Sequence, residues 1–148
     1  MFVRRFLLAA VLAVVALPAL ATDKVHHLAL QISDASVDKM TAVLNVAANV
    51  SRHYSEVGEE VEIRIVAFNA GLVMLRTDKS PVLTRLKSVS ESLPNVAFEA
   101  CGNTRDSMAR NEGKKPEEIP LFAGAKIVTA GVVSLIELGE KGWTIVRP

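Results

Sequence analysis

Alternation of apolar and polar positions marks several stretches of this chain as β-strands. From Val25 onward, Leu28, Leu30 and Ile32 alternate with less apolar neighbours, and the stretch VEIRIVAF at 61–68 combines alternation with β-branched residues. Such patterns are typical of strands. Three further short strands are expected from the same pattern at 95–101, 126–130 and 143–148.

Apolar residues at helical spacing fill the stretches between these strands. One long series predicts an amphipathic helix of about four or five turns. Its apolar positions are Val37, Met40, Val43, Leu44, Ala47, Val50 and Tyr54. A second helix is expected within 80–93, and shorter ones at 103–110 and 131–139. The stretch 111–122 carries charges and prolines, so we expect an exposed loop there.

This succession of strands and helices predicts an α/β fold. Strands joined through helices pair in parallel, so we expect a three-layer α/β/α sandwich with a mostly parallel sheet of about five strands. Right-handed crossovers would place every strand-to-helix turn on one edge of that sheet. Open sheets of this kind bind their ligands outside the carboxyl ends of the strands. Residues at that edge are therefore the first candidates for function.

The first 21 residues have the pattern of a secretory signal peptide. Two arginines precede an apolar run at 6–17, and small residues lead to Ala21. A membrane anchor is the alternative, but the apolar run is shorter than the roughly 20 residues that span a bilayer. We therefore expect cleavage after Ala21, export to the periplasm, and a single domain over residues 22–148.

The net charge and the missing sequence motifs exclude several classes of function. The 148 residues carry a formal net charge of +1, and loss of Arg4 and Arg5 with the signal peptide would make it −1. This balance predicts no nucleic-acid partner and no attachment to a charged membrane after cleavage. The sequence contains no GxxxxGKS loop, no GxGxxG turn, no HExxH pattern and no CxxC pair. We therefore expect neither a nucleotide or other cofactor nor a metal site.

Cys101 is the only cysteine in the chain, so it has no partner for an internal disulfide. A lone thiol in an exported protein forms an intermolecular bond, reacts, or is a small buried residue. Asn103 or Thr104 is a suitable N-cap for the next helix, which would place the thiol at a helix N-terminus. The amide groups there would lower the thiol pKa and stabilise a thiolate or a persulfide. From position alone, a reactive and a buried Cys101 are equally expected.

Small-residue turns follow three of the expected strands. They are Asn69-Ala70-Gly71, Cys101-Gly102-Asn103-Thr104 and Thr129-Ala130-Gly131. All three belong on the carboxyl edge if the predicted fold is right. Their glycines allow tight turns or close approach to a bound group, although each alone is ordinary turn chemistry. No histidine is expected near this edge, so Cys101 is better suited to carrying a group than to hydrolysis.

Three segments carry a resemblance to a known family. They are VEIRIVAFNAGLVML, VAFEACGNTRDSM and IVTAGVVSLIELGEKGWTIVRP, within a similarity that covers nearly all of the chain from His27 to Pro148. In these segments the sequence resembles the DsrE/DsrF-like family, in particular its small exported members. The resemblance implies a three-layer α/β subunit that assembles into a homo-oligomer, a trimer or a hexamer. It also implies that Cys101 carries sulfur as a persulfide, with Asn103 and Thr104 shaping its site.

Two functions remain open after this comparison. The first is a sulfur carrier or thiol-redox protein, rather than a turnover enzyme, that exchanges sulfur through Cys101 with a donor or acceptor protein. The second is a non-catalytic homo-oligomer that binds a small ligand or a partner, in which Cys101 is only structural. The chain differs from the cytoplasmic relay proteins in its export signal and in the CGNT sequence at the cysteine. Fold transfers between relatives more safely than function.

Overall fold

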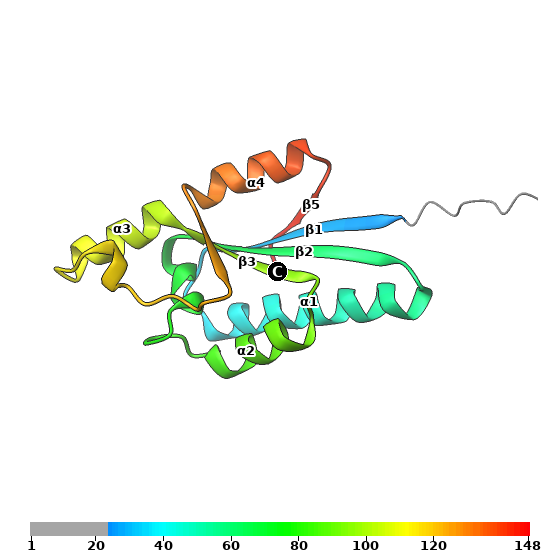
Figure 1. The fold of residues 1–148 in the computed structure, drawn as a ribbon, viewed down its shortest axis with the longest axis horizontal. Helices are drawn as coiled ribbons and strands as arrows, with labels where there is room; N and C mark the ends of the chain where they lie inside the picture. Colours follow the sequence, from blue (N-terminus) through cyan, green and yellow to red (C-terminus); the bar gives the residue numbers. More distant parts are fainter. Residues whose placement is uncertain (1–23) are drawn as a thin grey trace, which may run out of the picture.

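Five parallel strands form the centre of the molecule. The structure, a computed structural model, describes residues 24–148, and the expected signal peptide lies outside these residues. The strands are β1 (Val25–Ile32), β2 (Glu60–Ala67), β3 (Val96–Cys101), β4 (Ala125–Val128) and β5 (Thr144–Val146), in the spatial order β4-β3-β2-β1-β5. Every pairing between neighbouring strands is parallel (Figure 1). The predicted α/β fold with a parallel five-stranded sheet is confirmed.

Helices lie on both sides of this sheet. They are α1 (Val37–Val57), α2 (Leu83–Ser92), α3 (Gly102–Asn111) and α4 (Gly131–Glu140), with two short 3-10 helices, η1 (Asn69–Leu75) and η2 (Pro116–Glu118). In Figure 1, α1 and α2 lie below the sheet and α4 lies above it, whereas α3 extends beyond the ends of the strands. The three expected layers are present, and the upper layer is the thinner one.

The long helix α1 begins and ends at residues suited to those positions. Ser36 accepts a hydrogen bond from the backbone N–H of Lys39 at 3.4 Å, which caps the N-terminus. Gly58 ends the helix with a φ of 72°, in the left-handed region that glycine adopts without strain. Within residues 24–148, none of the helices is both long enough and apolar enough to cross a bilayer.

Two apolar clusters hold the helices to the sheet. The larger lies between the sheet and the pair α1 and α2, and it includes Leu30, Met40, Leu44, Ile63, Ile65, Leu86, Phe98 and Ala100. The smaller lies under α4 and consists of Ala29, Val66, Leu135 and Leu138, with Phe68 and Trp143 packed against them. Successive strand residues point to opposite faces. Since Phe98 and Ala100 belong to the larger cluster, Glu99 and Cys101 lie on the α4 side.

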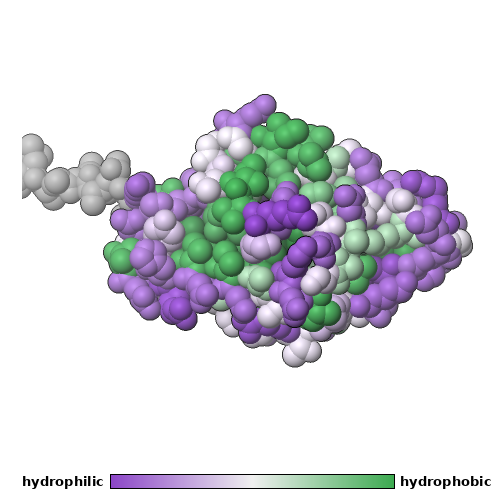
Figure 2. Space-filling view, turned by 180° about the vertical axis from the view of Figure 1, so that it is seen from behind, coloured by the Kyte–Doolittle hydropathy of each residue, from purple (hydrophilic) through white to green (hydrophobic). Residues whose placement is uncertain are grey.

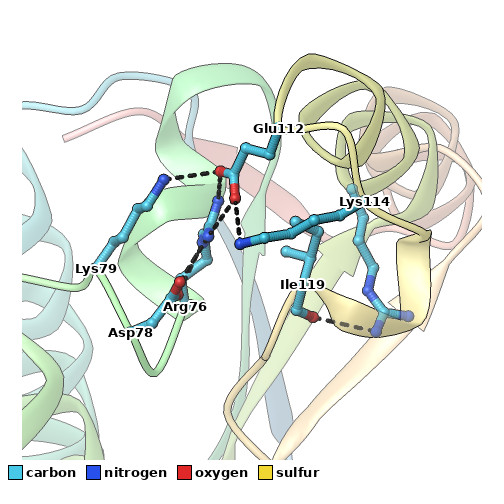
Figure 3. Close-up of polar contacts among 7 residues, drawn as sticks. Arg76, Asp78, Lys79, Glu112, Lys114 and Ile119 are labelled. Carbon is cyan, nitrogen blue, oxygen red and sulfur yellow. Dashed lines mark hydrogen bonds and ion pairs between the residues drawn. The ribbon is translucent and has the colours of Figure 1, made fainter.

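A buried arginine ties the chain after α3 to the end of η1. The Arg76 side chain is 1% exposed, and its guanidinium donates to Asp78 at 2.9 and 2.7 Å and to both carboxylate oxygens of Glu112 (Figure 3). Lys79 and Lys114 donate to Glu112 as well, at 2.8 and 3.0 Å. The hydrogen bonds from Arg76 are the largest cause that holds the pKa of Asp78 and of Glu112 below the ordinary carboxyl value.

The stretch 111–122 is more ordered than its charges and prolines predict. Ile119 is fully buried, its carbonyl accepts a hydrogen bond from the Arg105 guanidinium at 3.2 Å, and the Phe122 N–H donates to the Leu75 carbonyl at 2.8 Å. The prediction of an exposed loop is therefore wrong for the second half of this stretch. Leu121 and Phe122 pack against the larger apolar cluster, whereas the charged residues that precede Ile119 face solvent or, in the case of Glu112, contact Arg76.

Candidate functional site

The small-residue turns predicted for the carboxyl edge meet there. The backbone N–H of Asn69 donates to the hydroxyl oxygen of Thr104 at 3.0 Å, which joins the end of β2 to the first turn of α3. The N–H of Asn103 donates to the carbonyl of Thr129 at 3.1 Å, which joins the same turn to the chain after β4. The prediction that these turns share one edge is confirmed. They surround the last residue of β3, Cys101.

Cys101 is also the N-cap residue of α3. The expectation that Asn103 or Thr104 caps this helix is wrong, because the helix begins earlier and both residues lie in its first turn. Cys101 has φ −66° and ψ 115°, the extended backbone of an N-cap. Its side chain makes no capping hydrogen bond, but this position places the sulfur beside the N–H groups of the first turn of α3. The residue is 5% exposed.

Two opposing effects act on the pKa of the Cys101 thiol. Burial raises it, because a buried thiolate loses its hydration. The Thr104 hydroxyl and the backbone N–H groups of Gly131, Thr104 and Asn103 act in the other direction, because donors near the sulfur stabilise a thiolate. Together these donors outweigh burial, so the pKa of Cys101 lies below the ordinary cysteine value. The site therefore stabilises the thiolate form relative to an ordinary cysteine.

The Thr104 hydroxyl is held in the orientation that the thiolate needs. A hydroxyl has one proton to donate and two lone pairs that accept. Because the Thr104 oxygen accepts from the Asn69 N–H, its proton is free to point at the Cys101 sulfur. Asn69 contributes through its backbone, which adopts a φ of 49° in the left-handed region that asparagine tolerates better than most residues.

Gly131 lets the first turn of α4 approach the cysteine closely. A Cβ atom at this position would lie 3.0 Å from the Cβ of Phe68 and 3.4 Å from the Cβ of Cys101. Ala130, the N-cap residue of α4, provides no capping side chain, so side-chain capping does not take up the N–H groups of that turn. The Gly131 N–H is one of the groups that face the sulfur. Two helix N-termini, those of α3 and α4, thus converge on Cys101.

The other two predicted glycines have packing roles. A Cβ on Gly102 would lie 3.0 Å from the Val128 carbonyl oxygen, so this glycine allows α3 to start against β4. A Cβ on Gly71 would lie 2.2 Å from the Ile32 carbonyl oxygen, and Gly71 therefore seats η1 on the end of β1.

A polar group that the sequence reasoning missed lies on the same face of β3 as Cys101. Glu99, two residues earlier, is 2% exposed. One of its carboxylate oxygens accepts from the Arg64 guanidinium at 2.9 Å and the other from the Ser134 hydroxyl of α4. The Arg64 guanidinium in turn lies 5.0 Å from the centre of the Trp143 ring. The available sequence signal was the single acidic residue in the otherwise apolar strand VAFEAC.

The two histidines of the first strand lie at the opposite edge of the sheet, as expected. His26 stacks on Tyr54 with ring centres 4.0 Å apart, and His27 lies 4.9 Å from Trp143. Two hollows, of about 640 and 430 Å³, open at this edge as well. Neither is lined by Cys101, Gly102 or Gly131. Among residues 24–148, no three histidine, cysteine or acidic side chains are grouped as metal ligands.

Comparison with known proteins supports the fold. No family model and no curated protein matches the sequence. Among solved structures, the chain is similar to MTH1491, a protein of unknown function from Methanobacterium thermoautotrophicum. The TM-score is 0.68 at 24% sequence identity, and the alignment covers 83% of this chain and 99% of that one. This similarity establishes that the chain shares the α/β architecture of that protein.

Proposed function

We propose that this protein is a periplasmic sulfur carrier or thiol-redox protein that acts through Cys101, as an exported member of the DsrE/DsrF-like family. The observation that carries the proposal is the position of Cys101 at the N-terminus of α3 and against the first turn of α4, where nearby donors lower the thiol pKa. A thiolate is the reactive form of cysteine. The terminal sulfur of a persulfide is also an anion, and backbone N–H groups at helix N-termini stabilise anions of this size.

The proposed reaction transfers one sulfur atom without an external oxidant. The Cys101 thiolate attacks the terminal sulfur of a donor persulfide, R–S–SH. A new S–S bond forms at Cys101 while the S–S bond of the donor breaks, and the donor leaves as its thiolate, RS⁻. The terminal sulfur keeps its proton in this step, and its later ionisation yields the anion that the helix N-termini stabilise. Delivery to an acceptor thiolate is the reverse exchange with a different partner.

The absence of a base beside the cysteine is consistent with this chemistry. Within the described residues, the histidines lie at the far edge of the sheet, and the buried Glu99 carboxylate is engaged by Arg64 and Ser134. A hydrolytic cysteine needs a general base to activate it or the water that follows. Sulfur exchange needs only a thiolate and an accessible donor. The site is therefore better suited to carrying a sulfur atom than to hydrolysis.

The test is sulfur loading of the purified protein. Incubation with a low-molecular-weight persulfide, followed by intact mass spectrometry without reductant, should add about 32 Da, the mass of one sulfur atom. The variant Cys101→Ser should stay folded and gain no mass. An unmodified wild-type protein under conditions that load a small thiol would reject the proposal.

One observation favours a second candidate function. Cys101 is only 5% exposed, which is ordinary for a cysteine that serves as a small core residue. In this case the protein is a non-catalytic homo-oligomer that binds a ligand or a partner, and Cys101 has only a structural role in the core. Alkylation of the folded protein separates the two candidates. A thiolate that reacts faster than a free cysteine below pH 8 supports the carrier, and a thiol that reacts only after unfolding supports the binding protein.

The exposed face of α4 supports the proposal of a homo-oligomer, a trimer or a hexamer. Val132, Val133 and Ile136 are 52, 49 and 55% exposed on this ten-residue helix. In Figure 2, hydrophobic surface gathers at the top of the molecule, where Figure 1 places α4. Contiguous apolar patches on a protein surface mark contact sites. A second copy of the chain is the occupant we propose for this face.

A further inference from the structure

The hydrogen bond between Ser134 and Glu99 connects α4 to the strand that carries the cysteine. Ser134 lies one turn after the start of α4, and its backbone N–H donates to the Ala130 carbonyl at 3.0 Å. Its hydroxyl donates to one carboxylate oxygen of Glu99. The other Glu99 oxygen accepts from Arg64 at 2.9 Å. Both oxygens of this buried carboxylate are thus engaged.

This hydrogen bond is directional, whereas the side chains of α4 in the smaller cluster contact the sheet through apolar groups. Leu135 and Leu138 pack on Ala29 and Val66. Apolar packing favours contact but does not by itself fix the position of a helix along its axis. A hydrogen bond weakens steeply when its geometry changes. Since α4 has no capping side chain at its start, the bond from Ser134 to Glu99 is the polar contact that sets where the helix begins.

The position at which α4 begins affects the cysteine site through Gly131, the first residue of the helix. Gly131 packs closely beside the cysteine, since a Cβ there would lie 3.0 Å from the Cβ of Phe68 and 3.4 Å from the Cβ of Cys101, and its N–H is one of the groups that lower the thiol pKa. Glu99 precedes Cys101 by two residues on the same face of β3. A bond from α4 to Glu99 therefore fixes the helix relative to the cysteine itself.

We propose that Ser134 and Glu99 are positioning residues that hold the Gly131 N–H against the Cys101 sulfur. The inference rests on the proposed function in that it explains how the site keeps a reactive thiolate. Arg64 supports the pair by holding the Glu99 carboxylate, and the Trp143 ring lies 5.0 Å from its guanidinium. Neither Ser134 nor Glu99 needs to touch the sulfur or its donor.

The experiment compares Ser134→Ala with two controls. Ser134→Thr keeps the hydroxyl, and Ser88→Ala makes the same chemical change on the exposed side of α2, far from the site. The alkylation rate of Cys101 by iodoacetamide is measured against pH, and the solvent exchange of the Gly131 amide is measured by NMR. Ser134→Ala should slow alkylation at pH 7 about three- to tenfold, the equilibrium effect of one hydrogen bond, and should speed Gly131 exchange. Both controls should behave as wild type.

A second variant covers the case in which Ser134→Ala is poorly folded. Glu99→Gln keeps the shape of the side chain but removes the charge that holds Arg64 and Ser134. It should slow alkylation and speed Gly131 exchange in the same direction. If either folded variant leaves both readouts at their wild-type values, the proposed positioning role is wrong.

The outcomes also separate this inference from the proposed function. The first possible outcome is that the wild type takes no sulfur from a persulfide, while Ser134→Ala changes the Gly131 amide exchange and the pH profile of alkylation. This outcome rejects the carrier function and supports the positioning role of Ser134 and Glu99. The second is that the wild type loads sulfur and neither substitution changes these readouts, which supports the carrier function and rejects the positioning role. The amide exchange of Gly131 reports the geometry without any sulfur chemistry.

Discussion

The backbone N–H of Asn69 and the hydroxyl oxygen of Thr104 are 3.0 Å apart, and this contact joins the end of β2 to the first turn of α3. It leaves the hydroxyl proton free for the Cys101 sulfur, which sits at the N-cap of the same helix. The thiol site is thus assembled from the ends of separate strands. Each strand contributes backbone groups more than side chains.

We expect Thr104→Val to make Cys101 less reactive at neutral pH. The substitution keeps the shape of the side chain but removes the hydroxyl that donates to the sulfur and accepts from Asn69. The thiol pKa should rise, and alkylation at pH 7 should slow about three- to tenfold. Thr104→Ser retains the hydroxyl and should keep most of the rate. Equal rates for the valine and serine variants would show that the hydroxyl does not act on the thiol.

Gly131→Ala should disturb the thiol site, whereas Gly139→Ala on the same helix should not. At Gly131 a Cβ would press on Phe68 and Cys101 in a packed region, and overpacking of this kind costs about 1–3 kcal/mol of unfolding free energy. At Gly139 the nearest atom is the tip of the Ile145 side chain at 3.3 Å, which can move. The helical preference of alanine should then leave that variant unchanged or stabilised.

Chemical denaturation and the alkylation rate measure both glycine variants. Gly131→Ala should lower both the free energy of unfolding and the alkylation rate of Cys101, since the Gly131 N–H moves away from the sulfur as the helix is displaced. If Gly139→Ala proves as damaging as Gly131→Ala, the close approach of α4 to Cys101 is not what the glycine provides.

The fold and the location of the site follow from the sequence to a large extent. Hydrophobic periodicity located all five strands and the four helices, and the rule for parallel sheets placed Asn69, Cys101 and Gly131 on one edge. These properties are local, or depend only on the order of elements.

The details of the site could not be predicted because they depend on tertiary contacts. The N-cap of α3 was misplaced by two or three residues, since Cys101 itself takes the capping position where β3 runs directly into the helix. Glu99 was passed over because its partners, Arg64 and Ser134, are each 35 residues away in the sequence. The contact between the Ile119 carbonyl and Arg105 likewise joins residues 14 positions apart, which hydrophobic patterning does not reveal.

Arg76→Met should destabilise the protein and flatten its response to acid. Removing the guanidinium leaves Asp78 and Glu112 without their main partner and replaces a buried, fully paired arginine, so the free energy of unfolding should fall. Lys79→Met is the matched control and should have the smaller effect, because the Lys79 side chain is half exposed and solvent screens its pair with Glu112. Urea denaturation at pH 7 measures both.

The sign of the acid response follows from the lowered carboxyl pKa values. Asp78 and Glu112 have folded pKa values below their unfolded values of about 4. Their contribution to stability is therefore complete above about pH 5 and is lost as the pH falls toward the folded values. The wild type should lose stability below about pH 4 more steeply than Arg76→Met. Parallel curves for the two proteins would show that this cluster does not control acid stability.

Ile136→Asp should dissociate the proposed homo-oligomer without unfolding the subunit. Ile136 is 55% exposed on α4 beside Val132 and Val133, so a charge there is solvated in the monomer but buried without a partner in an interface, which is unfavourable. Val37→Asp is the control, because Val37 is 50% exposed on α1, on the other side of the sheet. Light scattering after size exclusion should give a monomer for Ile136→Asp and the wild-type mass for Val37→Asp. If the wild type is itself a monomer at tens of micromolar, the face of α4 is not an interface between copies of this chain. If Val37→Asp also dissociates the assembly, the contact lies on the α1 side or the effect of the charge is not specific to α4.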